Sequence, residues 1–246
     1  AAFSAGESKC TYGTGAFLLL HTGSKLVMSK RKLLTTVAAM TDAKPQYALE
    51  GSVFVAGAAV QWLRDGLKLF AQSADSEALA QKADREQGVI FVPALVGLGA
   101  PHWAPEARGA LFGLTHSTGP SELAQAALEG VAFQVADLLD AARHDASTPL
   151  PELCVDGGMT RNNWFLQTQA DILGIPVLRA KQTEATALGA AFLAGLKLGV
   201  WKSQEELRRI VAAGQHFTPA WPPAERERRL GQWRKAVKAV VEFYKD

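Results

Sequence analysis

The segment VDGGMTRNN, residues 155–163, constrains the fold of this chain more than any other stretch. A short apolar run ends in an acid, two glycines follow, and then comes a polar start typical of a helix. Adjacent glycines let the backbone adopt positive φ and approach a ligand with no Cβ in the way. The helix that follows would present unpaired N–H groups and its positive dipole end toward whatever lies over the turn. The segment therefore predicts a strand, a turn and a helix, with the turn serving either a ligand or only the backbone.

A second glycine turn lies in TYGTGAFLLL, residues 11–20. Two apolar runs separated by Gly and Thr predict adjacent strands of a hairpin or meander. The glycines could serve backbone geometry alone. Alternatively, the amides of Gly13 to Gly15 and the Thr14 hydroxyl could donate to phosphate oxygens. Neither turn matches the P-loop pattern or the G-x-G-x-x-G fingerprint of dinucleotide-binding domains.

Composition limits the class of protein. With 246 residues, 48% of them hydrophobic, the chain can bury a core of one large or two small domains. A net charge of +2 argues against a nucleic-acid partner. The five histidines show no metal-ligand spacing, so no metal site is expected. Cys10 and Cys154 are expected to be buried, reduced thiols of a cytoplasmic protein. No apolar stretch approaches the ~20 residues of a membrane span.

Hydrophobic periodicity predicts one α/β domain, in which strands alternate with helices after an initial β meander. The helix at residues 76–85 is expected to be capped by Ser76, and residues 97–109 form a loop. An apolar stripe on the C-terminal helix should pack on the core through Leu230, Trp233, Val237, Val240 and Tyr244. Strands are expected at residues 11–20, 25–29, 33–40, 46–51, 88–95, 110–114, 152–156 and 176–179. Helices are expected at residues 53–70, 76–85, 120–144, 163–174 and 185–199, and in the tail after residue 225, the 185–199 helix being rich in small residues suited to close packing.

Four segments resemble the C-terminal half of the FGGY family of carbohydrate kinases: KCTYGTGAFLLLHTG, YALEGSVFVAGAAVQWLRD, GLGAPHWAPEARGALFGLT and VDGGMTRNNWFLQTQADILGIPV, the last followed by ATALGAAFLAGL. The resemblance covers essentially the whole chain, and the APHWAPEARG form is similar to the branch that phosphorylates glycerol. It implies an actin-like ATPase (ribonuclease H-like) fold, with a mixed sheet flanked by helices, here as one nucleotide-binding domain over residues 1–246. It also implies ATP and Mg²⁺ as cofactors and glycerol as substrate.

The same resemblance assigns nucleotide-binding roles to individual residues. Thr14 would contact the phosphates, Gly57 and Gln61 would lie beside the nucleotide, and Gly158 and Asn162 would line the adenosine pocket. Read without the family, Gly57 is a helix-packing glycine, Gln61 a solvated side chain and Asn162 only a helix cap. The implied cofactor-binding set is Gly13, Thr14, Gly57, Gln61, Gly158 and Asn162.

Several parts of the family's machinery are not in this sequence. The resemblance places the catalytic aspartate, a second phosphate loop and the glycerol-binding residues in an N-terminal half, upstream of a chain that opens as if cut from something longer. The chain is therefore expected to be inactive alone, with that half as its partner, and a homo-oligomer is possible. Structural roles are expected for Asp42, Glu50, Asp65, Glu129 and Asp156, although Asp156 could instead touch the nucleotide indirectly. Arg108 could steady the loop GAPHWAP, residues 99–105, and is expected to pair with a carboxylate rather than to touch substrate. Two alternatives are a kinase for another polyol or sugar, and a non-catalytic nucleotide-dependent regulator on the same scaffold.

Overall fold

A computed structural model describes residues 2–39, 44–211 and 214–245. Within these residues seven strands form one mixed sheet, and two more form a separate antiparallel pair, β5 (Ile90–Val92) with β6 (Ala110–Phe112). Across the large sheet the strands are β3 (Leu34–Val37), β4 (Tyr47–Val53), β2 (Ala16–Gly23), β1 (Ser8–Tyr12), β7 (Leu153–Asp156), β8 (Val177–Arg179) and β9 (Gln215–Phe217). The predicted α/β architecture with a mixed sheet is confirmed.

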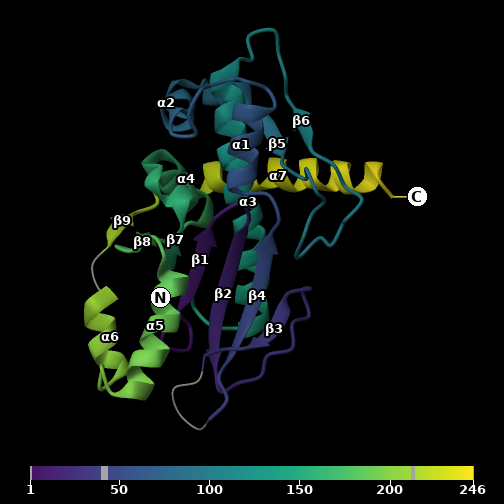
Figure 1. The fold of residues 1–246 in the computed structure, drawn as a ribbon. Helices are drawn as coiled ribbons and strands as arrows, with labels where there is room; N and C mark the ends of the chain where they lie inside the picture. The colour runs from purple at the N-terminus through teal and green to yellow at the C-terminus, as the bar shows by residue number, and fades with distance from the viewer. Residues whose placement is uncertain (1, 40–43, 212–213, 246) are drawn as a thin grey trace.

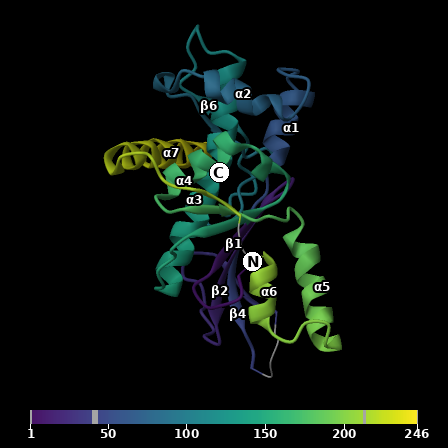
Figure 2. The same cartoon turned by 90° about the vertical axis from the view of Figure 1, so that its left-hand side faces the viewer.

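Helices cover both faces of the large sheet (Figures 1 and 2). The long helix α3 lies on one face and extends past the end of the sheet to α1 and α2, while α5 and α6 lie along the other face. None of the described helices is long and apolar enough to cross a bilayer. The α-helices are α1 (Gly57–Asp65), α2 (Asp75–Lys82), α3 (Pro120–Ala146), α4 (Asn163–Leu173), α5 (Ala185–Leu198), α6 (Gln204–Val211) and α7 (Pro223–Phe243), and two 3₁₀ turns are η1 (Arg85–Gln87) and η2 (Gly158–Arg161).

Strand β1 lies at the centre of this arrangement. It pairs antiparallel with β2, as the predicted hairpin requires, and parallel with β7. Its side chains alternate between the two faces, with Cys10 and Tyr12 buried in the core. On the opposite face the Lys9 ammonium donates to the Thr186 hydroxyl of α5 at 3.3 Å. The strand thus joins the meander to the βαβ part of the sheet.

The predicted strand at residues 25–29 is wrong, because this segment has no strand pairing. Val27 is buried, while the side chains on either side of it are exposed. The Ser29 hydroxyl donates to the Asp145 carboxylate at 2.5 Å and accepts the Leu33 N–H at 2.8 Å. Side-chain hydrogen bonds therefore replace a strand ladder here. The strand predicted over residues 33–40 is shorter, and its last residue lies outside the described residues.

Several helix boundaries also differ from the prediction. Of the helix expected at residues 53–70, only α1 (Gly57–Asp65) forms, because residue 53 belongs to β4 and Gly66 ends the helix. Ser76 is not a cap: it is buried within the first turn of α2, where its hydroxyl donates to the Ser73 carbonyl at 2.6 Å. Helix α6 and strand β9 were not predicted from the sequence.

The two helices with a predicted packing face behave differently. In α7 the stripe of Leu230, Trp233, Val237 and Val240 is buried as expected, whereas Tyr244 follows the last helical turn and is 39% exposed. In α5 only Phe192 and Gly195 are buried, so the expected close packing of this helix is not found among the described residues.

Candidate nucleotide site

The carboxyl ends of β1 and β7 bring the two glycine turns together. The strands are parallel neighbours, with Thr11 opposite Asp156 in the register. The turn of residues 13–15 and the turn of residues 157–158 therefore leave the same edge of the sheet. In open α/β sheets ligands bind in the crevice outside the carboxyl ends of the strands.

A pocket of ≈ 380 Å³ lies over these two turns, between α1, α2 and the start of α4. It is lined by all six residues to which the sequence assigned a nucleotide-binding role: Gly13, Thr14, Gly57, Gln61, Gly158 and Asn162. Those residues come from three separate segments of the chain. The structure brings them into one cavity, and their contact with a nucleotide stays a prediction.

The turn between β1 and β2 is held by the first residues of α1. The Gly57 N–H donates to the Gly13 carbonyl at 3.0 Å, and the Ala56 and Ala58 N–H groups donate to the Thr14 carbonyl at 2.8 and 3.1 Å. A Cβ on Gly57 would lie 2.6 Å from the Gly13 oxygen. The start of α1 therefore packs on the turn as closely as a glycine allows.

This packing decides which groups of the turn remain available for a ligand. The Gly13 N–H donates to the Gly15 carbonyl at 2.8 Å, so it cannot serve as one of the anion-binding amides considered from the sequence. Across the described residues, the Thr14 and Gly15 amides and the Thr14 hydroxyl have no hydrogen-bond partner. These three donors are the ones that a phosphate above the turn could use.

The adjacent glycines of the second turn have different roles. Gly157 adopts φ +94° and ψ 173°, a region that only glycine populates readily. A Cβ there would lie 2.7 Å from the Tyr12 carbonyl carbon and 2.9 Å from the Tyr12 nitrogen. A Cβ on Gly158 would meet nothing within 4 Å, and Gly158 lines the pocket. Gly157 thus satisfies the backbone, while Gly158 keeps the cavity open.

The start of α4 has no unpaired N–H group, contrary to the prediction from the sequence. The short helix η2 separates the glycine turn from α4, and Asn162 caps α4 by accepting the Phe165 N–H at 2.8 Å. Glu77 of α2 accepts the N–H groups of Asn163 and Trp164 at 3.1 and 3.2 Å. The protein itself therefore satisfies this helix end, and the predicted capping role of Asn162 is confirmed.

The sequence did not identify the other residues of the pocket. Some of them adjoin recognised motifs, as Met159 and Arg161 adjoin Gly158, and could have been found from that proximity. Ser76 and Glu77 belong to α2, and Ser73 and Ala74 lie just before it; this part of the sequence carried no functional signal. These further lining residues are Tyr12, Val60, Ser73, Ala74, Ser76, Glu77, Leu128, Met159 and Arg161.

Two of the acidic residues near the motifs, Asp156 and Asp65, have structural partners. Asp156 is buried and accepts the Thr11 hydroxyl at 2.6 Å and the Ala185 N–H at 3.1 Å. Asp65 pairs with Arg64 at 2.7 Å on the surface, Glu50 lies within β4, and Asp42 is outside the described residues. The expected carboxylate partner of Arg108 is not found among the described residues. Its guanidinium donates instead to the carbonyls at positions 105 and 107, which fits the alternative that Arg108 steadies the loop of residues 99–105.

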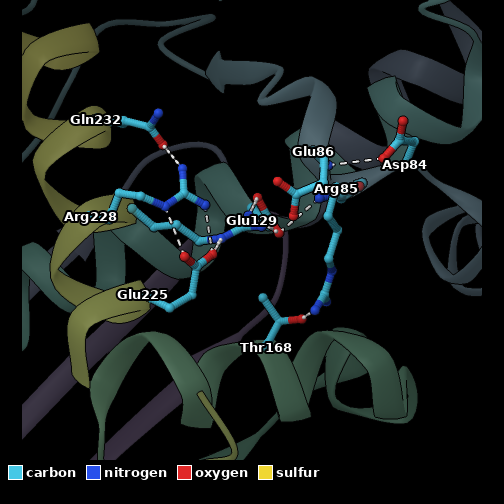
Figure 3. Close-up of polar contacts among 10 residues, drawn as sticks. Asp84, Arg85, Glu86, Glu129, Thr168, Glu225, Arg228 and Gln232 are labelled. Carbon is cyan, nitrogen blue, oxygen red and sulfur yellow. Dashed lines mark hydrogen bonds and ion pairs between the residues drawn. The ribbon is translucent and has the colours of Figure 1, made fainter. Parts of the chain in front are cut away.

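Glu129 belongs to a network that joins α3 to α7 (Figure 3). Its carboxylate lies 3.3 Å from the Arg229 guanidinium and accepts the Gln125 amide at 3.0 Å. Burial raises the pKa of Glu129 despite the charge of Arg229. In contrast, hydrogen bonds from Arg228 and Arg229 lower the pKa of Glu225 to about 2. Glu129 of this network comes directly after Leu128 in α3, and Leu128 lines the pocket.

Solved structures share this fold. A Plasmodium falciparum glycerol kinase with ADP superposes with a TM-score of 0.90 at 39% identity, covering 97% of this chain and 48% of that one. A Lactobacillus acidophilus xylulose kinase superposes with a TM-score of 0.84 at 24% identity. The domain therefore has the actin-like ATPase fold that the sequence motifs implied.

The sequence profile of the FGGY family of carbohydrate kinases, C-terminal domain, matches residues 8–198. The chain belongs to this family. It is 52% identical to a glycerol kinase of Myxococcus xanthus over 96% of its length and 51% identical to a glycerol kinase of Haemophilus influenzae over 98%. It spans about half the length of these relatives, 48% in each case.

Proposed function

We propose that this chain is the nucleotide-binding half of an enzyme that transfers a phosphoryl group from ATP to glycerol, giving glycerol 3-phosphate. The observation that carries the proposal is the convergence of all six assigned residues on one pocket. The identity of about half with glycerol kinases over nearly the whole chain supports the choice of substrate. By the same reasoning we propose ADP as the product held at this site.

The groups that line the pocket support this proposal. We place the phosphates over the β1–β2 turn, where the Thr14 hydroxyl and the Thr14 and Gly15 amides are available as donors. We place the adenosine between α2 and the η2–α4 segment, where Gly158 leaves open space. Gln61, exposed on α1 one turn after Gly57, supplies an amide that can donate and accept. A Cβ at Gly57 or Gly158 would intrude on the turn or the cavity.

The remaining groups of the reaction are assigned to the other half of the enzyme. Phosphoryl transfer to an alcohol requires a base for the hydroxyl and charge stabilisation on the phosphates. Within the described residues, no three His, Cys, Asp or Glu side chains lie together as metal ligands. We propose that Mg²⁺ is held by the phosphates and the N-terminal half, which also supplies the base and the glycerol site. Mg²⁺ would neutralise charge on the phosphates when bound.

The location and assembly of the enzyme are also proposals. Cys10 is buried as expected, whereas Cys154 is only partly buried. The buried thiol of Cys10 fits the reducing environment of the cytoplasm. The near-balanced charge of +2 fits a small-molecule substrate rather than nucleic acid. A homo-oligomer remains a prediction, and light scattering of the longer enzyme would test it.

Calorimetric titration of the 246-residue chain with ADP tests the nucleotide site directly. We expect saturable binding with a stoichiometry of one. The same preparation should produce no ADP from ATP in the presence of glycerol. Absence of ADP binding would refute the proposed site, and glycerol-dependent turnover at ordinary kinase rates would refute the division of labour between the halves. A panel of other polyols and sugars, assayed with the longer enzyme, tests the substrate.

A further inference from the structure

Glu77 connects two walls of the pocket that are distant in the sequence. It lies in the first turn of α2, and its Oε1 accepts the N–H groups of Asn163 and Trp164 at the start of α4. These residues are 86 and 87 positions away along the chain. Glu77 and Asn162 both line the cavity. One carboxylate therefore bridges from the α2 wall to the residue next to a predicted nucleotide contact.

The electrostatics of the helix end favour this bridge. The first amides of a helix have no partner within the helix, and its N-terminus carries partial positive charge. Glu77 satisfies the first two amides of α4, and the Asn162 side chain satisfies the third, that of Phe165. Hydrogen bonds to an ionised carboxylate are stronger than those to a neutral acceptor. The bridge is consequently a strong connection, and the end of α4 is closed to other anions.

The α2 wall of the pocket, residues 73–77, is itself bonded to α1. The Arg64 guanidinium of α1 donates to the Ser73 hydroxyl at 2.9 Å, and the Ser76 hydroxyl donates to the Ser73 carbonyl at 2.6 Å. Ser73 and Ser76 both line the pocket. Through these contacts and Glu77, α1, α2 and α4 form one connected frame around the cavity.

We propose that Glu77 is a positioning residue for the nucleotide: it sets the spacing between the α2 wall and the Gly158–Asn162 wall. This inference rests on the proposed function, and it assigns Glu77 no contact with the reacting atoms. It predicts that loss of the bridge lowers the affinity for the nucleotide. The bridge depends on Glu77 Oε1, the oxygen that accepts the two N–H groups. Removal of the negative charge alone matters less than removal of the acceptor.

Three variants separate positioning from general stability. Glu77→Ala removes the bridge, and Glu77→Gln keeps an acceptor oxygen without the charge. Glu122→Ala is the matched control, because Glu122 also accepts two backbone N–H groups, those of Gly119 at 2.8 Å and Asp84 at 3.2 Å, and does not line the pocket. For each, the Kd for ADP is measured by calorimetry well below the midpoint of thermal unfolding.

We expect Glu77→Ala to raise the Kd for ADP about tenfold, equivalent to the loss of one hydrogen bond to a charged group. Glu77→Gln should stay within about threefold of the parent chain, and Glu122→Ala within about twofold even where it lowers the unfolding temperature equally. An unchanged Kd in Glu77→Ala, or an equal loss in Glu122→Ala, would overturn the inference alone. Failure of the parent chain to bind ADP would overturn the proposed function and, with it, this role of Glu77.

Discussion

The two glycines at 157 and 158 provide the sharpest test of how this site is built, because substitution should affect stability at Gly157 and ligand binding at Gly158. Gly157→Ala forces a Cβ into backbone conformation φ +94°, ψ 173°, at a cost of about 1–3 kcal/mol. The same Cβ would lie 2.7 Å from the Tyr12 carbonyl carbon, so β7 must shift away from β1. Together we expect a loss of about 3–5 kcal/mol in the free energy of unfolding.

Gly158→Ala should leave stability within about 0.5 kcal/mol, because its φ is not positive and its Cβ has open space. That open space is the pocket, so a larger side chain should displace ligand. We therefore expect Gly158→Val to weaken ADP binding at least about tenfold while the protein stays folded.

Urea denaturation of the parent chain and both alanine variants, monitored by tryptophan fluorescence, gives the free energies directly. Thermal unfolding should show a midpoint roughly 10 °C lower for Gly157→Ala than for Gly158→Ala. Equal stability of the two alanine variants would refute the division of roles between the glycines. Undiminished ADP binding by Gly158→Val, with the parent chain binding normally, would refute the placement of the nucleotide beside Gly158.

Three further predictions concern charge and burial. Arg229→Ala should cost about 3–5 kcal/mol, since Glu129 would lose its buried counter-ion. That change raises the folded-state pKa of Glu129 further above its unfolded value. The stability of the variant should therefore fall as pH rises above the ordinary pKa of a glutamate, and chemical denaturation showing the opposite slope contradicts this. Arg161→Gln should weaken ADP binding several-fold and reduce the dependence of the Kd on salt, since among the described residues Arg161 is the only Lys or Arg lining the pocket. An unchanged salt dependence in calorimetry contradicts this prediction. Burial raises the pKa of Cys10 to about 12, so peptide mapping after iodoacetamide treatment at pH 8 should find Cys10 modified only in urea, and rapid modification of the folded chain contradicts the burial.

The sequence was sufficient for features that depend on nearby residues. The hairpin around Gly13, the helix beginning at Pro120 and the strand ending at Asp156 all follow from local periodicity and turn chemistry. The strand predicted at residues 25–29 failed because Ser29 bonds to Asp145, a partner 116 residues away. Local propensity contains no information about such a contact.

The candidate site shows the same limit. The family resemblance assigned nucleotide-binding roles to six residues, and all six line one pocket. The sequence could not separate the roles of Gly157 and Gly158, because these depend on how close each lies to Tyr12. Glu77 was missed because its partners, Asn163 and Trp164, are brought to it only by tertiary packing. Because this contact could not be foreseen, the N–H groups at the start of α4 were expected to be unpaired.

The parallel pairing of β1 with β7 has a consequence for the order of events in folding. Thr11 and Asp156 are separated by 145 positions, so the two glycine turns meet only after most of the chain has been synthesised and this loop has closed. Long-range closure of this kind is slow compared with formation of local hairpins and helices. The pocket should therefore form late, and a ligand that binds it should slow unfolding while leaving the refolding rate unchanged. Nucleotide binding would then report completion of the fold, and kinetic measurements with and without ADP would reveal it.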